Sequence, residues 1–528
     1  MHDRFWLAIG LLPGRPRRPD ALRLAPWAAL GAFALLMGLL FLGTRGLMEP
    51  DEGRYAECAR EMLVSGNFVT PTLGGEPHFA KPPLTYWLIA ASMTALGRTE
   101  AAVRLPTAIA YAATVMLVAW FGTVLWGRRT GLVAGIVYAT FVTTFAAANI
   151  VTPDTPLALW EALALFSFWR GFTARTPTER WVWPAVTGAA FGLAMLTKGP
   201  PGLLFLPAML LFRRLPAGRR PGAAPVISLA GVFLFCAIGL SWYLYSVWTR
   251  PELWSYFLGQ ELVGRVLGHH HRNHQWYGAL VIYLPTLLVG ALPWCLAWPG
   301  IARRWQRSLG GERPLTAMTH RPRTLLLALA FVVPMVVLTI SRSRLPLYLL
   351  PLFVPLALVT ARGVMQAVEG QHRSLVWNLV PLRWAQALPV WIVALIAARF
   401  LLAAWPNPSD ARRLYRSLPR GKGVELVVSE PGHNGLAFYY ARDEGNRALV
   451  EYAWWPGRAD SDGRVSITDE IAEESRPTDH HHLFVVADAD CDRLKALLGA
   501  AGATIRQTAK FPGGYAVLTA ARTQAPGG

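Results

Sequence analysis

The sequence predicts a polytopic α-helical membrane protein that ends in a small soluble α/β domain. Its 528 residues are 53% hydrophobic and only 16% charged, whereas soluble globular chains carry about 25% charged residues. Several apolar runs are about 20 residues long, which is enough for a helix to cross a bilayer core of about 30 Å. From about residue 407 the apolar runs shorten and acidic residues become more frequent, which indicates the start of the soluble part.

The length criterion predicts about eleven spanning helices. These are 26–43, 103–126, 132–148, 156–172, 181–195, 202–212, 226–248, 280–301, 325–340, 345–360 and 388–405. The apolar stretch 84–96 is short and follows Pro82-Pro83. It is therefore either a further span or a helix that lies at the membrane interface.

Basic residues orient these segments. If 84–96 lies at the interface, the Arg-rich connections all fall on one side: 128–129, 170–180, 213–220, 303–323 and 362–383. By the positive-inside rule that side is the cytoplasm. The same loop arginines explain the net charge of +19, so we expect membrane lipids as partners and no nucleic acid.

This orientation gives a multi-pass protein of the bacterial inner (plasma) membrane with a cytoplasmic N-terminus. We expect a membrane domain over 1–406 with a periplasmic loop at 44–98, and a periplasmic α/β domain over 407–528. In that domain the pattern predicts strands at 424–428, 482–486 and 515–518, and a helix at 490–500. The four cysteines form no CxxC spacing and indicate no disulfide framework.

The first outer loop opens with three carboxylates directly after a membrane helix. They are Glu49, Asp51 and Glu52, followed by Arg54 and Tyr55. Charges near a bilayer are costly to desolvate, so they tend to be functional or paired. We predict Asp51 as a catalytic carboxylate with Glu52 in support. The alternative is a solvated loop in which Arg54 is an ion-pair partner.

The next outer loop carries Asp154, the only charge between Arg129 and Glu161. It is a second candidate catalytic carboxylate, although an aspartate before Thr-Pro is also a good N-cap. Lysine is the other clue, because Lys81 and Lys198 are the only lysines before residue 400 and both fall in outer connections. An ammonium is a suitable partner for phosphate; the alternative is snorkelling at the interface.

Two further outer connections are rich in cations. The loop 259–277 carries His269, His271 and Arg272, which could bind a metal or an anionic phosphate. Consecutive histidines seldom all reach one ion, so we favour phosphate, predict no metal ligands and keep a divalent metal as the alternative. Arg342 and Arg344 lie at the mouth of a helix, where they could hold phosphate or snorkel, and Tyr348 could bind substrate or pack. Acids and cations on one face suit transfer from a phosphate-linked donor.

Six motifs in order resemble one family. They are Glu49-Pro50-Asp51-Glu52-Gly53-Arg54-Tyr55, Lys81-Pro82-Pro83-Leu84-Thr85-Tyr86-Trp87, Arg104-Leu105-Pro106, Thr152-Pro153-Asp154, Thr197-Lys198-Gly199-Pro200 and Leu345-Pro346-Leu347-Tyr348. Together they extend from Glu49 to Tyr348, a little over half of the chain. The sequence resembles bacterial lipid-linked-sugar glycosyltransferases of the GT-C fold, and is most similar to lipid A aminoarabinose transferases and protein mannosyltransferases.

The resemblance implies about 11 to 13 transmembrane helices and a sugar donor carried on undecaprenyl phosphate. It implies inverting transfer to lipid A or another envelope acceptor on the periplasmic side. Asp51 would be the main catalytic carboxylate and Asp154 a second one. Arg54, Tyr55 and Lys81 would line the donor site, and Tyr348 would face the same cavity.

One departure bears on substrate and metal. Aminoarabinose transferases usually carry a Glu just before the lysine, whereas Ala80 precedes Lys81 here. This argues against a metal at that position and leaves the identity of the sugar open. The alternatives are a protein O-mannosyltransferase-like enzyme and, in another class, a secondary transporter or lipid flippase. Transporter sites lie near the bilayer midplane, whereas the acids here lie at helix ends, which favours the enzyme.

Overall fold

The computed structural model describes residues 20–519 apart from 260–274, 276, 311, 370–378, 419–423, 430–432, 444–449, 454–466, 469–470, 472–480 and 512–513. The chain forms two compact units. The first contains Met1–Leu40, Ala80–Thr85 and Arg104–Leu402, and the second contains Phe41–Phe79, Tyr86–Val103 and Ala403–Gly528.

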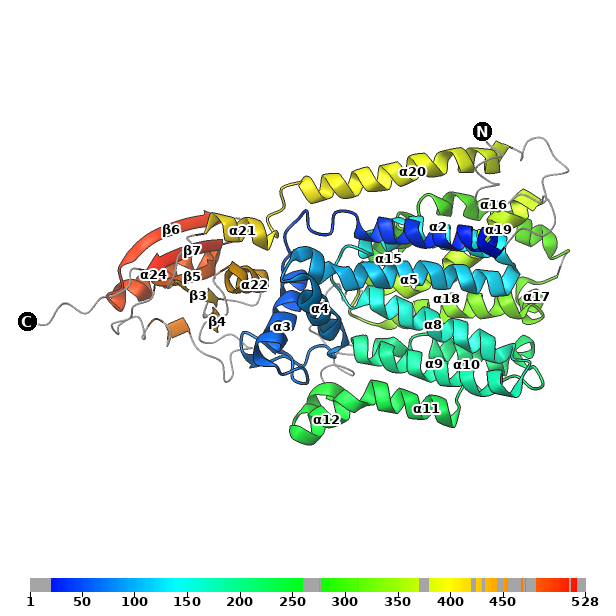
Figure 1. Cartoon of the computed structure of the whole chain (residues 1–528), viewed down its shortest axis with the longest axis horizontal. Coiled ribbons are helices and arrows are strands. Elements are labelled where there is room, and N and C mark those ends of the chain that lie inside the picture. The colour runs from blue at the N-terminus through cyan, green and yellow to red at the C-terminus, as the bar shows by residue number, and fades with distance from the viewer. Residues whose placement is uncertain are drawn as a thin grey trace, which may run out of the picture. The chain divides into compact units, whose positions relative to one another are not determined.

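The first unit is helical, and its long helices α5, α8, α9 and α18 run roughly along one direction (Figure 1). Its main helices are α2 (Asp20–Leu39), α5 (Glu100–Trp126), α6 (Arg128–Thr140), α7 (Val142–Ala147), α8 (Asp154–Phe172), α9 (Pro177–Lys198), α10 (Leu206–Arg214), α11 (Leu229–Phe235), α12 (Ser241–Thr249), α15 (Gly278–Leu288), α16 (Trp298–Ser308), α17 (Pro314–Thr319), α18 (Pro322–Ile340), α19 (Phe353–Glu369) and α20 (Leu379–Ala404). Short 3-10 turns include η1 (Pro200–Leu203) and η6 (Pro346–Leu352), and a π-helical turn, Cys236–Leu240, joins α11 to α12. Every predicted span contains helix, which confirms the predicted fold class.

Within the described residues, five helical stretches are long and apolar enough to cross a membrane by length and composition. They are Glu100–Trp126, Leu229–Thr249, Pro322–Ile340, Pro346–Glu369 and Gln386–Ala404. The other predicted spans are shorter, broken or more polar in the described residues. The predicted span 132–148 divides into α6 and α7 at Phe141, whose backbone is extended. Helix α8 is 19 residues long but carries Asp154, Glu161 and Arg170.

The neighbouring helices α8 and α9 are joined by side chains as well as by apolar packing. The hydroxyls of Ser167 and Thr187 lie 2.9 Å apart, and both residues are buried. Near them, Phe166 of α8 makes edge-to-face contacts with Phe121 and Trp183. Interhelical hydrogen bonds and close aromatic packing hold membrane helices together where lipid gives no hydrophobic drive. This pairing fixes the ends of α8 and α9, which carry two of the predicted site residues.

The second unit combines α3 (Asp51–Ser65), the hairpin β1 (Thr72–Leu73)–β2 (Glu76–Pro77) and most of α4 (Leu84–Leu96) with the C-terminal region. The C-terminal region contains α21 (Ala411–Ser417), β3 (Val424–Ser429), α22 (Asn434–Asp443), β4 (Val450–Ala453), β5 (His481–Ala487), α24 (Cys491–Ala500), β6 (Ile505–Phe511) and β7 (Gly514–Thr519). The stretch 84–96 is thus helical, as both of its predicted alternatives required.

The C-terminal sheet has the strand order β4-β3-β5-β7-β6. Strand β3 pairs in parallel with β4 and β5, whereas β7 is antiparallel to β5 and β6. Its core contains Val427, Phe484 and Val517 packed with Leu494 and Leu498 of α24. The strands predicted at 424–428, 482–486 and 515–518 and the helix at 490–500 are confirmed. The prediction missed β4 and β6, the two edge strands.

Candidate functional site

Helix α3 presents Asp51 in its first turn. The acidic first turn suits the helix, because Asp51 and Glu52 complement the positive N-terminal end of the helix dipole. One turn along, Arg54 Nη2 lies 2.5 Å from Asp51 Oδ1. The two side chains are 40% and 30% exposed, so the pair stays accessible to a ligand.

The other acids of α3 are engaged in holding the structure. Glu52 is buried, makes two hydrogen bonds to the Arg45 guanidinium at 2.6 and 3.0 Å, and accepts another from the Met48 N–H. Glu57 is paired with Arg60 at 2.6 and 2.8 Å, and burial raises the pKa of Glu57. Asp51 is therefore the acid of α3 that remains open to solvent.

Two tyrosines stand beside this pair. The Arg54 guanidinium lies 5.8 Å from the centroid of the Tyr55 ring, and the Tyr55 and Tyr86 rings are 5.5 Å apart. Both rings are buried, so they give Arg54 a fixed, apolar support. A cation close to an aromatic face is stabilised by the ring quadrupole. The structure thus brings Asp51, Arg54 and Tyr55 together on α3, with Arg54 as the ion-pair partner that the alternative reading required; their catalytic and donor-binding roles stay predictions.

The first unit holds a second cluster. Lys198 Nζ donates a hydrogen bond to Asp154 Oδ1, and both side chains are buried, at 8% and 7% exposed. The ammonium also lies 4.0 Å from the centroid of the Tyr348 ring. The structure therefore brings together three residues that the sequence predicted separately.

Local sequence explains why Asp154 meets Lys198. Asp154 is the first residue of α8 and the N-cap position is taken by Pro153, so Asp154 is not the N-cap residue that the alternative required. Lys198 is the last residue of α9, which ends at Gly199 with φ of 79°, a conformation that favours glycine. An acid at a helix N-terminus and a base at a C-terminus both complement the helix dipoles.

The remaining predicted cations differ in their surroundings. Lys81 Nζ is half-buried and donates to the Ala80 carbonyl at 2.7 Å. Arg342 is exposed, whereas Arg344 is buried and donates to the carbonyls of Gln275 and Thr339 at 2.8 and 3.0 Å. The roles predicted for them in phosphate binding stay predictions. His269, His271 and Arg272 lie outside the described residues.

The sequence analysis missed two buried polar residues of the first unit. Glu161 of α8 is fully buried; its Oε1 accepts from the Leu204 N–H at 3.1 Å, and its Oε2 has no hydrogen-bond partner among the described atoms. The Tyr283 hydroxyl of α15 is likewise buried without such a partner. An ionisable residue within an apolar helix was the signal that could have identified Glu161.

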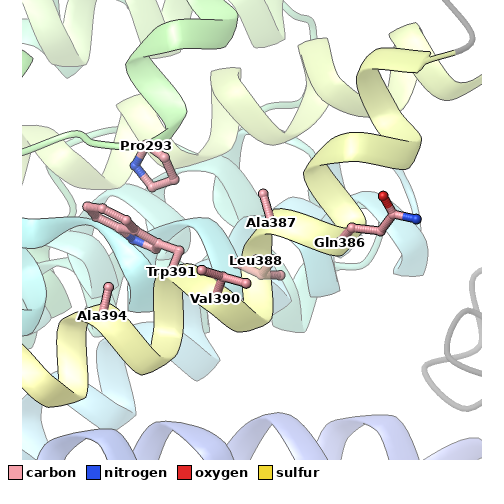
Figure 2. Close-up of a pocket in the computed structure, with 7 residues that line it drawn as sticks. All are labelled: Pro293, Gln386, Ala387, Leu388, Val390, Trp391 and Ala394. Atoms are coloured by element: carbon pink, nitrogen blue, oxygen red, sulfur yellow. The ribbon is translucent and has the colours of Figure 1, made fainter.

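An apolar pocket in the first unit lies apart from these residues. It has a volume of about 510 Å³ and is formed by α20 together with Pro293. Figure 2 shows Trp391 and Pro293 close together at this pocket, with Gln386 toward the other end. All lining residues except Gln386 are apolar or small: Pro293, Ala387, Leu388, Val390, Trp391 and Ala394. Among the described residues, the lining of this pocket offers no acid or base for chemistry.

The described residues offer no ready metal site. No three His, Cys, Asp or Glu side chains within them come close enough to hold an ion. The histidine loop that motivated the metal alternative lies outside this part of the chain.

Comparison of the sequence with known proteins assigns the chain to a family. Residues 27–257 match the family described as dolichyl-phosphate-mannose-protein mannosyltransferase. Over 436 residues the chain is 32% identical to the undecaprenyl phosphate-alpha-4-amino-4-deoxy-L-arabinose arabinosyl transferase of Aeromonas salmonicida, a match that covers 81% of this chain and 74% of that relative. The chain belongs to this arabinosyl transferase family. A relative of the same description from Pseudomonas savastanoi is 33% identical over 66% of this chain and 63% of its own length.

Solved structures agree on the fold of this arabinosyl transferase family member. The crystal structure of ArnT from Cupriavidus metallidurans bound to undecaprenyl phosphate has a TM-score of 0.69 and 21% identity, covering 95% of this chain and 99% of that one. An archaeal oligosaccharyltransferase from Archaeoglobus fulgidus has a TM-score of 0.52 at 12% identity, covering 94% and 74%. The chain is therefore a membrane glycosyltransferase of the GT-C fold, which confirms the resemblance of the motifs.

Proposed function

We propose that this glycosyltransferase moves aminoarabinose from undecaprenyl phosphate to a phosphate of lipid A on the periplasmic side of the inner membrane. The observation that carries the proposal is the Asp51–Arg54 pair. The Asp51 and Arg54 side chains are 40% and 30% exposed, whereas the other acids of α3 are engaged in hydrogen bonds or ion pairs. The chain is also 32% identical to the undecaprenyl phosphate-alpha-4-amino-4-deoxy-L-arabinose arabinosyl transferase of Aeromonas salmonicida. An accessible carboxylate beside a guanidinium suits a reaction that transfers a sugar between two phosphates.

The charges of the acceptor and of the departing group determine what the enzyme must supply. A lipid A phosphate is already ionised at neutral pH, so its oxygen can attack the anomeric carbon without a strong base. The new C–O bond forms as the bond to undecaprenyl phosphate breaks, and the departing group leaves as a phosphate anion. Transfer of a glycosyl group passes through an oxocarbenium-like state with positive charge on the sugar. In this proposal the Asp51 carboxylate stabilises that charge and orients the acceptor.

The departing phosphate needs cations. Arg54 and Lys198 are the candidates with defined surroundings, and fixed positive charges at such a group lower the barrier. Asp154 and the Tyr348 ring hold the Lys198 ammonium in place. Lys81, Arg272, Arg342 and Arg344 are further proposed phosphate contacts. If the acceptor were a hydroxyl instead, Asp51 would have to act as a general base.

Transfer by the purified chain tests the donor and acceptor together. We expect undecaprenyl phosphate-linked aminoarabinose and lipid A to yield lipid A that is heavier by one aminoarabinose unit in mass spectrometry. Parallel reactions with a mannosyl donor and with a protein acceptor separate the alternatives. Product in those reactions, and none with aminoarabinose and lipid A, would overturn the proposal and favour the mannosyltransferase-like alternative.

A labelling experiment tests the proposed sidedness. Glu76 in the turn region of the β1–β2 hairpin and Thr178 at the start of α9 are both exposed. The proposal places Glu76 in the periplasm and Thr178 in the cytoplasm. In intact spheroplasts we expect a membrane-impermeant maleimide to label Glu76→Cys strongly and Thr178→Cys only after lysis. The unmodified chain, with buried Cys58 and Cys491 and half-buried Cys236 and Cys295, gives the background; the reverse pattern would invert the topology.

A further inference from the structure

Glu49 connects the start of α3 to the start of α22 within the second unit. Its Oε1 accepts a hydrogen bond from the backbone N–H of Gly435, the second residue of α22, at 2.5 Å. The first N–H groups of a helix have no partner inside the helix, so Glu49 satisfies one of them from another segment. The Glu49 N–H in turn donates to the Ser409 carbonyl at 2.8 Å.

The Glu49 carboxyl is held in an enclosed position. Burial raises the pKa of Glu49 to about 8, although the Gly435 N–H and Arg54 act in the opposite direction. Burial thus favours the neutral form of the carboxyl, whose Oε1 accepts from the Gly435 N–H. A glutamine at this position would keep the same acceptor oxygen and nearly the same shape.

Two glycines allow α3 and α22 to approach this closely. A Cβ atom at Gly53 would lie 2.9 Å from Gly435 Cα and 2.5 Å from Glu49 Oε2. A Cβ atom at Gly435 would lie 2.7 Å from both the Ala411 Cβ and Glu49 Oε1. Heavy atoms do not pack at such distances. A methyl group at Gly53 must therefore move α3 away from α22, and one at Gly435 must displace α21 or the Glu49 carboxyl.

Further hydrogen bonds fix the residues that lead into α3. The Tyr439 hydroxyl of α22 accepts from the Leu47 N–H at 3.0 Å and donates to Glu100 at 2.9 Å. The Ala411 N–H donates to the Leu47 carbonyl at 2.9 Å. By contrast, the N-cap of α3 is Pro50, which provides no side-chain capping bond. The first turn of α3 is thus located by contacts from the C-terminal region more than by its own cap.

We propose that α22 positions the first turn of α3 through the Glu49–Gly435 contact, so that Asp51 and Arg54 keep the geometry that sugar transfer requires. Glu49 is then a positioning residue, two residues from Asp51, and the C-terminal region takes part in activity without touching the substrate. The role assigned to Asp51 here rests on the proposed function; the contact itself does not.

Two glycine variants form a matched pair. Gly435→Ala inserts a methyl group against Ala411 and Glu49, whereas a Cβ at Gly499 in α24 meets no atom within 4 Å. We expect Gly435→Ala to lower kcat at saturating donor by about 10²-fold, because a displacement of about 1 Å can cost that much. Gly499→Ala should match the unmodified enzyme. Equal kcat in the two variants would overturn the proposal.

Glu49 variants keep the proposal testable if Gly435→Ala fails to fold. Glu49→Ala removes the acceptor and should lower kcat at saturating donor by at least about tenfold, whereas Glu49→Gln should recover activity to within about threefold of the unmodified enzyme. The apparent melting temperature should differ little between the two Glu49 variants. If Glu49→Ala is fully active, or Glu49→Gln is as impaired as Glu49→Ala, the positioning role is wrong.

Hydrogen exchange separates this inference from the proposed function. Amides in the first turn of α3 should exchange faster in Glu49→Ala than in Glu49→Gln, whatever sugar the enzyme transfers. If the unmodified chain transfers no sugar from undecaprenyl phosphate but this difference is observed, the proposed function fails and the α22 contact stands. If transfer occurs and the exchange rates are equal, the contact does not position α3.

Discussion

Replacing Asp51 with asparagine is expected to lower kcat for sugar transfer by about 10²- to 10³-fold, the range lost when a group that stabilises developing charge or transfers a proton is removed. Asparagine keeps the shape of the side chain but loses the negative charge that would face the sugar. The fold should survive, because the Asp51–Arg54 pair is 40% and 30% exposed and such pairs contribute only about 0–1 kcal/mol. Kinetics with purified enzyme and melting curves in the same detergent measure both effects.

Glu52 provides the contrasting control. It adjoins Asp51 but is 1% exposed and bound to Arg45 and to the Met48 N–H. Glu52→Gln should therefore lower the melting temperature, because it weakens a buried ion pair, while the folded fraction keeps a much higher kcat than Asp51→Asn. If Asp51→Asn retained full activity, or if Glu52→Gln were the inactive variant, the assignment of the catalytic carboxylate would be wrong.

The helical fold was predictable because a helix that spans a membrane needs a continuous apolar run of about 20 residues, and such runs are visible in the sequence. The segment 325–340, for example, is a continuous apolar run, and in the structure it forms most of α18, which begins three residues earlier at Pro322 and ends at Ile340. Segments with internal breaks were harder. The run 132–148 reads as one span, but its backbone is extended at Phe141, and nothing in a run of apolar residues marks such a break.

The soluble sheet shows the same dependence on pattern. Strands β3, β5 and β7 lie inside the sheet and have apolar runs, so they were found. Strands β4 and β6 are its edges, and β6 carries Arg506, Gln507 and Lys510, which blurs the alternation. Polar residues on edge strands protect against unwanted pairing with other chains. The same residues disrupt the alternation of apolar and polar positions by which a strand is recognised in a sequence.

The candidate site was predictable as a set of residues but not as a set of contacts. Sequence singled out Asp154, Lys198 and Tyr348 for separate reasons, and only the structure pairs them. Asp154 and Lys198 are separated by two helices, so their meeting depends on the antiparallel packing of α8 and α9. Glu161 was missed because it was treated as the boundary of an uncharged stretch, although a buried acid in an apolar helix is itself informative.

The Asp154–Lys198 pair carries the largest expected effect on stability. Both side chains are buried, at 7% and 8% exposed, so Lys198→Met would leave the Asp154 carboxylate without its cation. Removing one partner of a buried pair costs about 3–5 kcal/mol, because an unpaired charge stays in a poorly solvated site. We expect Lys198→Met to lower the free energy of unfolding by about this amount and to abolish detectable transfer.

The double variant Asp154→Asn/Lys198→Met separates stability from chemistry. With both charges removed, no unpaired ion remains, so most of the lost stability should return and the two substitutions should be strongly non-additive. Activity should not return, because the cation proposed to meet the departing phosphate is absent. Denaturant unfolding and transfer rates on the four proteins of this cycle measure both. Restored activity in the stable double variant would limit Lys198 to a structural partner of Asp154. If the changes in the free energy of unfolding of the two single variants added up to that of the double variant, the two charges would not depend on each other.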